Sequence, residues 1–418
     1  MPTGVSTTRT RNRDLPSATS RGAASSKSRI LDLNGRNTGG NAEYLLQLCR
    51  GLDRERFEIT AAFPPGGKQD DGVRAAAADS VEIHFHHDGG VWSTLRGFVQ
   101  LVRMMRQRDF DVVHTHTSLA AALGRIAAWW TGVPTTIHML HSVASHDCVP
   151  PVRRWLFRQA ERFFDRFTTA YVAPSQAMID EGLRGKIFTA DKVRLVYNGI
   201  DCDAIEQAPL LDLRAELRLA PQTRIIGYLG RLVKQKGLPD LIAAVVQLRK
   251  SHSDFCVAIV GDGPMSAEIQ QQIHRAGLQE HFHFLGWRSD VGSVLREFDL
   301  LAMPSLWEAF GLAAVEAMAA CKPVVATQVQ GLQEVVEHDV TGLLVPPGAP
   351  DRLAASLGQL LDSPAMRQRM GEQGRLRARR LFDVQRVVRE HERLFVELCR
   401  PKTSERAAER SIHKSRAA

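Results

Sequence analysis

Short apolar runs alternate with amphipathic helical segments along most of the chain. Beginning at Arg29, the strand-like run RILDL is followed by a glycine loop, the helical pattern AEYLLQLCRGL and a second strand-like run, FEITAAF. The alternation continues with predicted strands at 81–86, 111–116, 133–141, 168–175 and 193–201, and with predicted helices at 94–107, 118–130 and 151–167. Strands that alternate with helices favour a parallel sheet covered by helices.

The pattern starts again after a polar stretch at 203–223. Here the predicted strands are 225–230, 255–260, 281–287, 300–305 and 323–327, with helices between them, and residues 351–399 have a helical pattern. A chain of 418 residues can form two domains with sizeable cores. The predicted fold class is therefore α/β, with two Rossmann-like, doubly wound parallel-sheet domains that face each other across a cleft. Such domains bind their ligand at the carboxyl ends of the strands.

The net charge of +8 is confined to the two ends of the chain. Residues 1–28 and residues 400–418 each carry a formal charge of +4, so that residues 29–399 are formally neutral. A neutral body argues against nucleic acid as a partner. Both tails are expected to be disordered and solvated. The Arg/Ser/Thr-rich, acid-poor composition of the first tail also fits a transit peptide.

The six cysteines are scattered, and no two of them lie within 50 residues of each other. This spacing is typical neither of a disulfide framework nor of a metal site, and it indicates core thiols in a reducing compartment. The sequence contains no apolar run of ~18 residues, so that no transmembrane helix is expected. The expected location is the cytoplasm.

The stretch PSLWEAFGLAAVEAMAAC places two carboxylates among residues that otherwise have the pattern of a core. Glu308 precedes the predicted helix, where a loop can point it into a cleft, and Glu316 lies about one turn inside the helix. Gly311 allows a ligand to approach the backbone, and the N–H groups around Gly311 and Leu312 favour anions. This pattern suits a phosphorylated, polyhydroxylated ligand. Its spacing alone fits an amphipathic helix with two exposed glutamates equally well.

Two cations lie in GRLVKQKG, between a predicted strand and a predicted helix. Arg231 offers a fork for phosphate and Lys236 a point charge, so that both can converge on one anion. The alternative is a solvated loop with two surface cations. An Asp-x-Asp pair, Asp201 and Asp203, ends the run VYNGID, where it marks the edge of an interdomain hinge.

Two glycine turns also follow predicted strands. VGDGP contains Gly261 and Gly263 but lacks the third glycine and the later acidic residue of a dinucleotide-binding fingerprint. GRNTGGN contains Gly39 and Gly40 and lacks the Gly-Lys-Ser/Thr of a P-loop. Either turn can admit a ligand to the backbone, and either can equally be a plain turn.

Five histidines cluster at predicted strand ends: His114, His116, His138, His141 and His146. A His-x-His pair can bind a metal, but no cysteine or paired carboxylate completes a ligand set, so that no metal is expected. A single histidine that lines the cleft is favoured instead.

The segment PVRRWLFRQAERFFDRF has arginines at a spacing of four, and its aromatic residues include Trp155, Phe163, Phe164 and Phe167. A basic, aromatic helix can lie on an anionic membrane, which would give peripheral contact through Arg154 and Arg158. In the favoured alternative, Glu161 and Asp165 pair with arginines of the same helix, and the aromatic residues pack inward.

Together, these motifs resemble glycosyltransferase family 4 over residues 29–399. The matching segments are the Gly39–Gly40 loop, DVVHTHTSLA, VPTTIHMLHSVASHD, VAPS, VYNGID, GRLVKQKG, VGDGP, FLGW and the E-(x)7-E pair of Glu308 and Glu316. The resemblance implies the GT-B fold, with an acceptor-side domain at 29–203 and a nucleotide-sugar-binding domain at 204–383. It also implies that a final helix, at about 384–399, crosses back to the first domain.

The resemblance further implies roles for individual residues. Arg231 and Lys236 would hold the donor diphosphate, and Glu308 would bind the sugar hydroxyls. His141 matches the histidine of the family's TVHG-like segment, near the reacting sugar, although Ser142 replaces the glycine that usually follows; His138 is the fallback. With Arg231, Lys236 and Glu308, the donor-binding residues would be Glu316 (for the ribose), Gly39, Gly40, Gly261, Gly263, Gly311 and Leu312.

The sequence thus predicts a retaining glycosyltransferase that moves a hexose-type sugar from a nucleoside-diphosphate sugar to a saccharide or lipid-linked saccharide acceptor, in polysaccharide or glycolipid assembly. Because Arg231, Lys236 and helix N–H groups can stabilise the leaving diphosphate, neither a cofactor nor a metal is expected. One alternative is a nucleotide-sugar epimerase or hydrolase of the same architecture, which would need no acceptor. The other is a non-catalytic sugar-nucleotide-binding module, against which the intact set of candidate residues argues.

Overall fold

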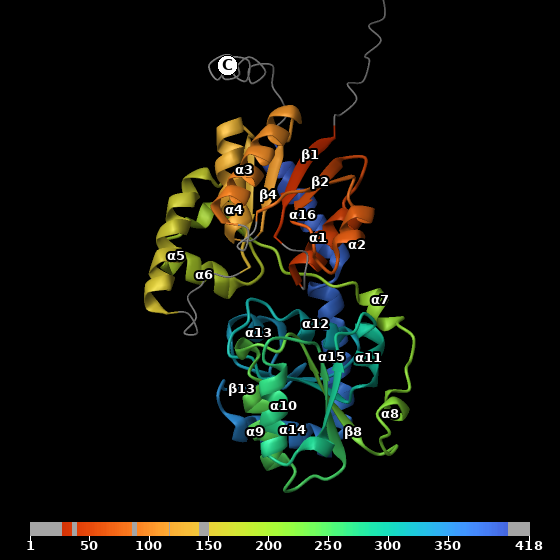
Figure 1. The fold of residues 1–418 in the computed structure, drawn as a ribbon. Coiled ribbons are helices and arrows are strands. Elements are labelled where there is room, and N and C mark those ends of the chain that lie inside the picture. The colour runs from red at the N-terminus through yellow and green to blue at the C-terminus, as the bar shows by residue number, and fades with distance from the viewer. Residues whose placement is uncertain (1–26, 36–39, 86–89, 117, 142–149, 400–418) are drawn as a thin grey trace, which may run out of the picture.

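The computed structural model describes residues 27–35, 40–85, 90–116, 118–141 and 150–399. Within these ranges the chain forms two parallel sheets covered by helices, and each sheet belongs to its own domain (Figure 1). The predicted α/β fold class of two Rossmann-like domains is therefore confirmed. The predicted tails lie outside the described residues, except that Ser28 is already the first residue of a strand.

The first sheet has the strand order β3-β2-β1-β4-β5-β6-β7. Its strands are β1 (Ser28–Leu33), β2 (Phe57–Phe63), β3 (Asp79–Glu82), β4 (Val112–Thr115), β5 (Thr135–Met139), β6 (Ala170–Ala173) and β7 (Val193–Leu195). The helices that connect them are α1 (Gly40–Gly51), α2 (Asp70–Ala76), α3 (Gly90–Gln107), α4 (Ser118–Thr131), α5 (Pro151–Phe164) and α6 (Gln176–Arg184). The chain reverses direction across this sheet between β1 and β4.

The second sheet has the strand order β10-β9-β8-β11-β12-β13 and reverses direction between β8 and β11. Its strands are β8 (Arg224–Leu229), β9 (Phe255–Val260), β10 (Phe282–Gly286), β11 (Leu300–Met303), β12 (Val324–Thr327) and β13 (Gly342–Val345). The helices of this part are α7 (Cys202–Glu206), α8 (Leu213–Glu216), α9 (Leu238–Leu248), α10 (Ser266–Arg275), α11 (Val291–Glu297), α12 (Leu312–Ala319), α13 (Gln330–Val335), α14 (Pro350–Asp362) and α15 (Pro364–Leu381).

Some elements differ from their sequence-based prediction because strand pairing decides where a strand ends. In the run 81–86, apolar residues alternate with polar ones as far as Phe85. However, β3 is an edge strand that pairs only with β2, and it ends at Glu82. The run 193–201 is strand only to Leu195, after which the chain leaves the sheet. The elements α2, α6, α7, α8, α13 and β13 were not predicted. They are short, and their patterns lack the periodicity of a long amphipathic helix.

The last helix, α16 (Val384–Leu398), packs in the first domain although it follows the helices of the second. Its Val387, Val388 and Phe395 belong to the apolar core beneath β1 and β2, and Figure 1 shows the helix lying among the first elements of the chain. The crossing runs beside the outgoing connection, since Ile200 N–H donates to Phe382 O at 2.9 Å and Val384 N–H donates to Ile200 O at 2.8 Å. Two segments, which pair through a parallel bridge between Ile200 and Asp383, therefore join the domains.

A buried ion pair fixes α5 to α4. The guanidinium of Arg125, which is fully buried, donates to both carboxylate oxygens of Glu161, at 2.9 and 3.1 Å. It also lies over the ring of Phe164. The expected pairing of Glu161 and Asp165 with arginines of their own helix is therefore wrong, because Asp165 pairs with Lys192.

The aromatic residues of α5 do not all pack inward either. Trp155 is 59% exposed and Phe163 is 46% exposed, since the face of α5 that meets α4 is occupied by the Arg125–Glu161 pair. In the described part of the chain, no helix is both long enough and apolar enough to cross a bilayer.

We expect Arg125→Ala to lower the free energy of unfolding of the first domain by about 3–5 kcal/mol, because Glu161 would be left as an unpaired buried charge. The double variant Arg125→Met/Glu161→Leu should lose much less. Urea unfolding followed by tryptophan fluorescence measures both. The control is Arg108→Ala, which breaks an exposed pair with Asp79 and should change stability by less than about 1 kcal/mol. Equal losses for Arg125→Ala and Arg108→Ala would contradict the buried-pair assignment.

Candidate functional site

Two loops meet at the carboxyl edge of the second sheet, where the strand order reverses. The loop after β8 and the loop after β11 are joined by Leu306 N–H donating to Gln235 O at 2.8 Å and by the Gln235 side-chain amide donating to Trp307 O at 3.0 Å. Gly237 has φ of +64°, and a Cβ there would lie 1.9 Å from Pro304 O. Only glycine allows this approach. A reversal of strand order is the usual ligand crevice of such sheets.

Glu308 and Lys236 face each other across this junction. Glu308 is buried, and its Oε1 accepts from Lys236 Nζ at 2.5 Å and from Ser305 Oγ at 2.8 Å. Arg231 comes from the same loop as Lys236 but is exposed, and no ion pair of its side chain is found among the described residues. The predicted pair of cations is therefore divided, with one held by a carboxylate and one free to meet a ligand.

The glycines of the neighbouring turn support that loop. A Cβ on Gly261 would lie 2.0 Å from Gly230 O, and one on Gly263 would lie 2.5 Å from Leu232 O. The loop after β8 could not sit this close if either residue had a side chain. The structure thus gives Gly261 and Gly263 a packing role, and their predicted donor contact stays a prediction.

The helix α12 begins at this junction with unpaired amides. Gly311 is its N-cap with φ of +104°, and a Cβ there would meet the side chain of Leu332. Within the described residues, the N–H groups of Leu312 and Ala313 have no hydrogen-bond partner. Free amides at a helix start attract anions.

The first domain comes close to α12. A Cβ on Gly40, at the start of α1, would lie 3.1 Å from Leu312 Cδ1. Ala309, next to Glu308, packs against the apolar cluster that contains Leu140, next to His141. Gly39 lies outside the described residues. The candidate residues of both domains therefore converge on one interdomain region.

Glu316 is partly buried, and among the described residues its carboxylate has no ion pair. Burial raises its pKa to about 7, the nearby Glu43 carboxylate adds to the rise, and Lys236 opposes it. With Glu308 buried as well, the alternative of two exposed glutamates is wrong. A carboxyl group held near neutrality in a crevice is typical of a functional position.

His141 belongs to a buried polar network of the first domain. Its Nε2 lies 3.1 Å from His116 Nδ1, and Asp32 Oδ2 lies 3.0 Å from His116 Nε2 and 2.9 Å from His114 Nδ1. Burial, together with the neighbouring His116 and His114, lowers the pKa of His141 well below its ordinary value. His138, the fallback, instead bonds to Thr115 O through Nδ1 at 3.1 Å, and the pKa of its buried ring is also lowered.

Asp32 is the residue that sequence reasoning missed. The absence of a carboxylate near the histidines in sequence was taken to exclude a ligand set, but β1 pairs with β4 so that Asp32 lies opposite His114. Asp32, His114 and His116 are close enough to hold a metal ion. Their facing atoms are already within hydrogen-bonding distance of one another, so that the arrangement fits a hydrogen-bond network without an ion.

Neither Asp-x-Asp pair resembles a metal site. Asp201 caps α7 by accepting from Ala204 N–H, and Asp203 bonds Arg379. A second pair, Asp109 and Asp111, precedes β4 at the opposite edge of the first sheet, where Asp111 accepts from Arg29 N–H.

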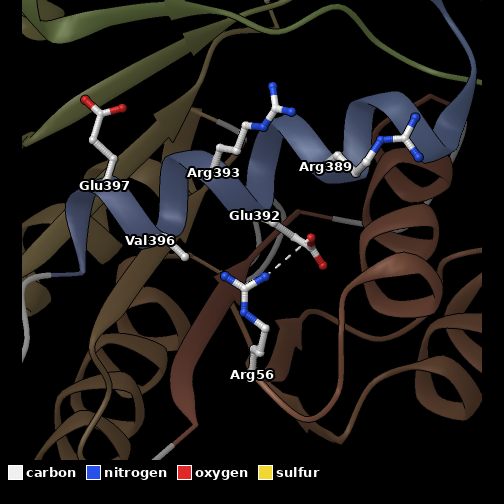
Figure 2. A pocket seen from close by; sticks show the side chains of 6 residues that line it. All are labelled: Arg56, Arg389, Glu392, Arg393, Val396 and Glu397. Atoms are coloured by element: carbon white, nitrogen blue, oxygen red, sulfur yellow. Dashed lines mark ion pairs between the residues drawn. The ribbon is translucent and has the colours of Figure 1, made fainter. Parts of the chain in front are cut away.

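One surface hollow, of about 390 Å³, lies between α1 and α16, and Glu43, the neighbour of Glu316, lines it. Another, of about 410 Å³, runs along α16 and is lined by Arg56, Arg389, Glu392, Arg393, Val396 and Glu397 (Figure 2). Figure 2 shows the ion pair of Arg56 with Glu392 across it, at 3.9 Å. The lining of this hollow contains three arginines and two glutamates, and one arginine is paired across it.

Two family models match this chain. "Glycosyltransferase Family 4" matches residues 38–204, and "Glycosyl transferases group 1" matches residues 211–377. The 2-deoxystreptamine glucosyltransferase of Streptomyces kanamyceticus is 31% identical over 292 residues, which is 64% of this chain and 72% of that protein. The UDP-Gal:alpha-D-GlcNAc-diphosphoundecaprenol alpha-1,3-galactosyltransferase of Escherichia coli is 25% identical over 311 residues, 72% of this chain and 79% of that protein.

Solved structures share the fold. Anabaena Alr3699/HepE, in complex with UDP and glucose, has a TM-score of 0.79 at 25% identity and covers 88% of this chain and 100% of its own. The sucrose-phosphate synthase from Thermosynechococcus elongatus has a TM-score of 0.74 at 22% identity, and the match covers 89% of this chain and 99% of that chain. At this identity, the similarity is evidence for the fold and not for the activity.

We expect Glu316→Gln to stabilise the protein at pH 8 and to have no effect near pH 4. Because the pKa of Glu316 is about 7 in the folded protein and 4.5 ordinarily, ionisation opposes folding increasingly as the pH rises from about 4.5 to 7. The gain at pH 8 should be roughly 1–3 kcal/mol, measured as a rise in the unfolding midpoint. The exposed Glu372→Gln is the control. A gain that is the same at both pH values would contradict the raised pKa.

Proposed function

This chain belongs to glycosyltransferase family 4, and we propose that it transfers a hexose, with retention of configuration, from a uridine-diphosphate sugar to a hydroxyl group of a lipid-linked saccharide. It is a GT-B glycosyltransferase that acts on nucleotide sugars. The retaining course, the base, the sugar, the acceptor and independence from metal are the proposed parts. The UDP of the solved Anabaena relative and the UDP-Gal of the E. coli relative's name support the choice of base.

The observation that carries the proposal is the junction of the two loops with α12. It brings together one exposed cation, one cation held by a carboxylate, and two free helix amides. Arg231 and the N–H groups of Leu312 and Ala313 would bind the diphosphate. A junction with cations, amides and a buried carboxylate suits a ligand with phosphate at one end and hydroxyl groups at the other.

In the proposed reaction, the bond from sugar C1 to the diphosphate oxygen breaks, and its electron pair leaves with the diphosphate. The acceptor oxygen bonds to C1 on the same face, and its proton passes to the departing diphosphate oxygen. Negative charge builds on the diphosphate, where Arg231, Lys236 and the amides are already in place. In the structure, Glu308 accepts a hydrogen bond from Lys236. When the donor is bound, Glu308 would accept a hydrogen bond from a sugar hydroxyl. His141, beside the junction on the first domain, would face the sugar.

An exposed aromatic surface on the first domain supports a lipid-linked acceptor. Its rings follow one another across α3, α4, α5 and the 3-10 turn directly after α5, with centroid separations of 6.2 Å for Phe98–Trp130, 5.3 Å for Trp129–Phe167 and 5.6 Å for Phe163–Phe167. Arg166 lies over Phe163, and Arg153 is exposed nearby on α5. Exposed tryptophans among arginines suit the headgroup region of an anionic bilayer.

We expect the protein to release UDP from a UDP-hexose only when an acceptor saccharide is present, and to do so in EDTA. Arg231→Ala and Lys236→Ala should each lower kcat by about 10²–10³-fold, because each removes a group that stabilises the leaving charge. Glu308→Ala should lose most activity with the donor whose hydroxyl it binds and less with an epimer that lacks that contact. A donor and acceptor panel, scored for released nucleotide and for product, measures these effects.

Glu297→Ala is the matched control, since Glu297 pairs with Arg214 on α8, away from the junction. Full activity of Glu308→Ala with every donor would remove its role. Loss of activity in EDTA that Mg²⁺ or Mn²⁺ restores would overturn the metal-independent part. Turnover of the donor without an acceptor would favour the hydrolase or epimerase, and donor binding without turnover would favour a binding module.

We further expect the protein to float with anionic liposomes at low salt and to be released by high salt, because the attraction of the arginines is electrostatic. The variant Trp129→Ser/Trp155→Ser/Arg153→Ser/Arg166→Ser should remain unbound. Replacing Arg249 and Arg275 by serine, on the second domain, is the control. Flotation that survives the fourfold change would exclude this surface and leave the tails as the membrane contact.

A further inference from the structure

The hydrogen-bond network behind His141 has a defined direction. Asp32 lies on β1, His114 lies on β4 with His116 directly after it, and His141 follows β5, so that three adjacent strands and their ends supply the network. Asp32 is 1% exposed and His116 is 2% exposed. Burial alone would raise the pKa of Asp32, but His116 and His114 hold it below its ordinary value, so that Asp32 is ionised.

An ionised carboxylate can only accept hydrogen bonds, so that each imidazole nitrogen that faces Asp32 must carry a proton. His116 therefore donates through Nε2. In a neutral ring, the other nitrogen, Nδ1, is then an acceptor, and it faces His141 Nε2 at 3.1 Å. His141 consequently donates through Nε2 and keeps Nδ1 without a proton. That nitrogen makes no hydrogen bond to the described residues.

The surrounding residues hold the rings in this orientation. Tyr44, on α1, packs edge-on against His116 with ring centroids 5.2 Å apart. Its hydroxyl donates to His391 Nε2, since His391 Nδ1 is used by Val387 O at 2.8 Å. His391 lies on α16, so that the helix that returns from the second domain also contributes a residue to the network.

From this geometry we propose that Asp32 is a positioning residue, which acts through His116 to fix the tautomer and orientation of His141, so that an unprotonated Nδ1 is presented to the sugar hydroxyl groups in the cleft. The proposal deepens the proposed function and rests on it for the identity of the ligand. Asp32 itself does not touch the substrate. A carboxylate that orients a working imidazole through a hydrogen bond is a general device, since the wrong tautomer presents a donor where an acceptor is needed.

Two other interpretations give different results in the same experiments. If Asp32, His114 and His116 bind a metal ion, the nitrogens that face Asp32 carry no protons and His116 cannot orient His141 in this way. If the network only fills the core, its loss lowers stability and changes the amount of active enzyme, but the tautomer of His141 is not coupled to Asp32.

The first experiment is independent of activity. In the full-length protein labelled with ¹⁵N-histidine, NMR should show His141 as a single neutral tautomer protonated at Nε2, with its signals assigned by their loss in His141→Ala. In Asp32→Asn, we expect His141 to become a mixture of both tautomers. Elemental analysis of the purified protein should find no stoichiometric metal. A stoichiometric metal, or a His141 tautomer that is the same in both proteins, would overturn the proposal.

The second experiment measures kinetics with the active donor and acceptor. We expect Asp32→Asn to lower kcat by about 10–100-fold, less than the ~10⁴-fold of a protease aspartate, because no proton has to pass to His141. The KM for the donor should change by less than about twofold. His141→Ala and Asp32→Asn/His141→Ala should have the same kcat, because Asp32 acts only through His141. Additive losses would overturn the proposal.

The control is Asp70→Asn, a buried aspartate on α2 of the same domain that accepts from Gly66 and Gly67 N–H, away from the histidines; its kcat should be unchanged. If Asp32→Asn does not fold, His116→Gln interrupts the same relay and should give the same changes in kcat and tautomer. If neither folds, the tautomer in the wild-type protein decides. If the wild type has no transferase activity, the proposed function fails, while the NMR result still tests the relay.

Discussion

The contact of Gly237 with Pro304 is the constraint on which the candidate site depends. Only a residue without a side chain allows the loop after β8 to lie against the backbone of the loop after β11. The hydrogen bonds between these loops then place Lys236 against Glu308 and leave the start of α12 open beside them. Gly261 and Gly263 extend the same close packing to the turn after β9. The glycines thus act first on the backbone, and the charged groups are positioned as a consequence.

Both domains place their polar groups where the strand order reverses, but with opposite chemistry. In the second domain, cations and free amides collect around one buried carboxylate. In the first domain, one buried carboxylate, Asp32, lies among histidines. The start of α1 meets the start of α12, so that the two sets face each other. A ligand that bridges them would have its phosphates on one side and its hydroxyl groups on the other, in agreement with the proposed transfer from a nucleotide sugar.

Two buried charges of the described residues have close polar partners, whereas Glu316 near the junction differs from them. Arg125 has Glu161, and Asp32 has two imidazoles. Glu316, by contrast, has Glu43 as a neighbour, and burial holds its pKa near neutrality. An ionised carboxyl group without a cation partner opposes folding, and the position of Glu316 within α12, near Lys236, agrees with the binding role expected of it. The crossing of α16 adds a second link between the domains, and His391 brings that helix into the network of the first domain.

The alternation of apolar runs and helical patterns determined the fold class, because a parallel sheet requires a crossover helix after nearly every strand. The local spacing in 230–237 and 304–321 also determined which residues are candidates, since each motif lies on one loop or helix. Strand pairing and helix packing decided where strands end and which distant residues become partners, and local sequence does not contain this information. It ended β3 at Glu82, brought Asp32 opposite His114 from 82 residues away, and made Glu161 the partner of Arg125. Such partners are far apart in the chain, and only the register of the folded sheet and the packing of its helices bring them together.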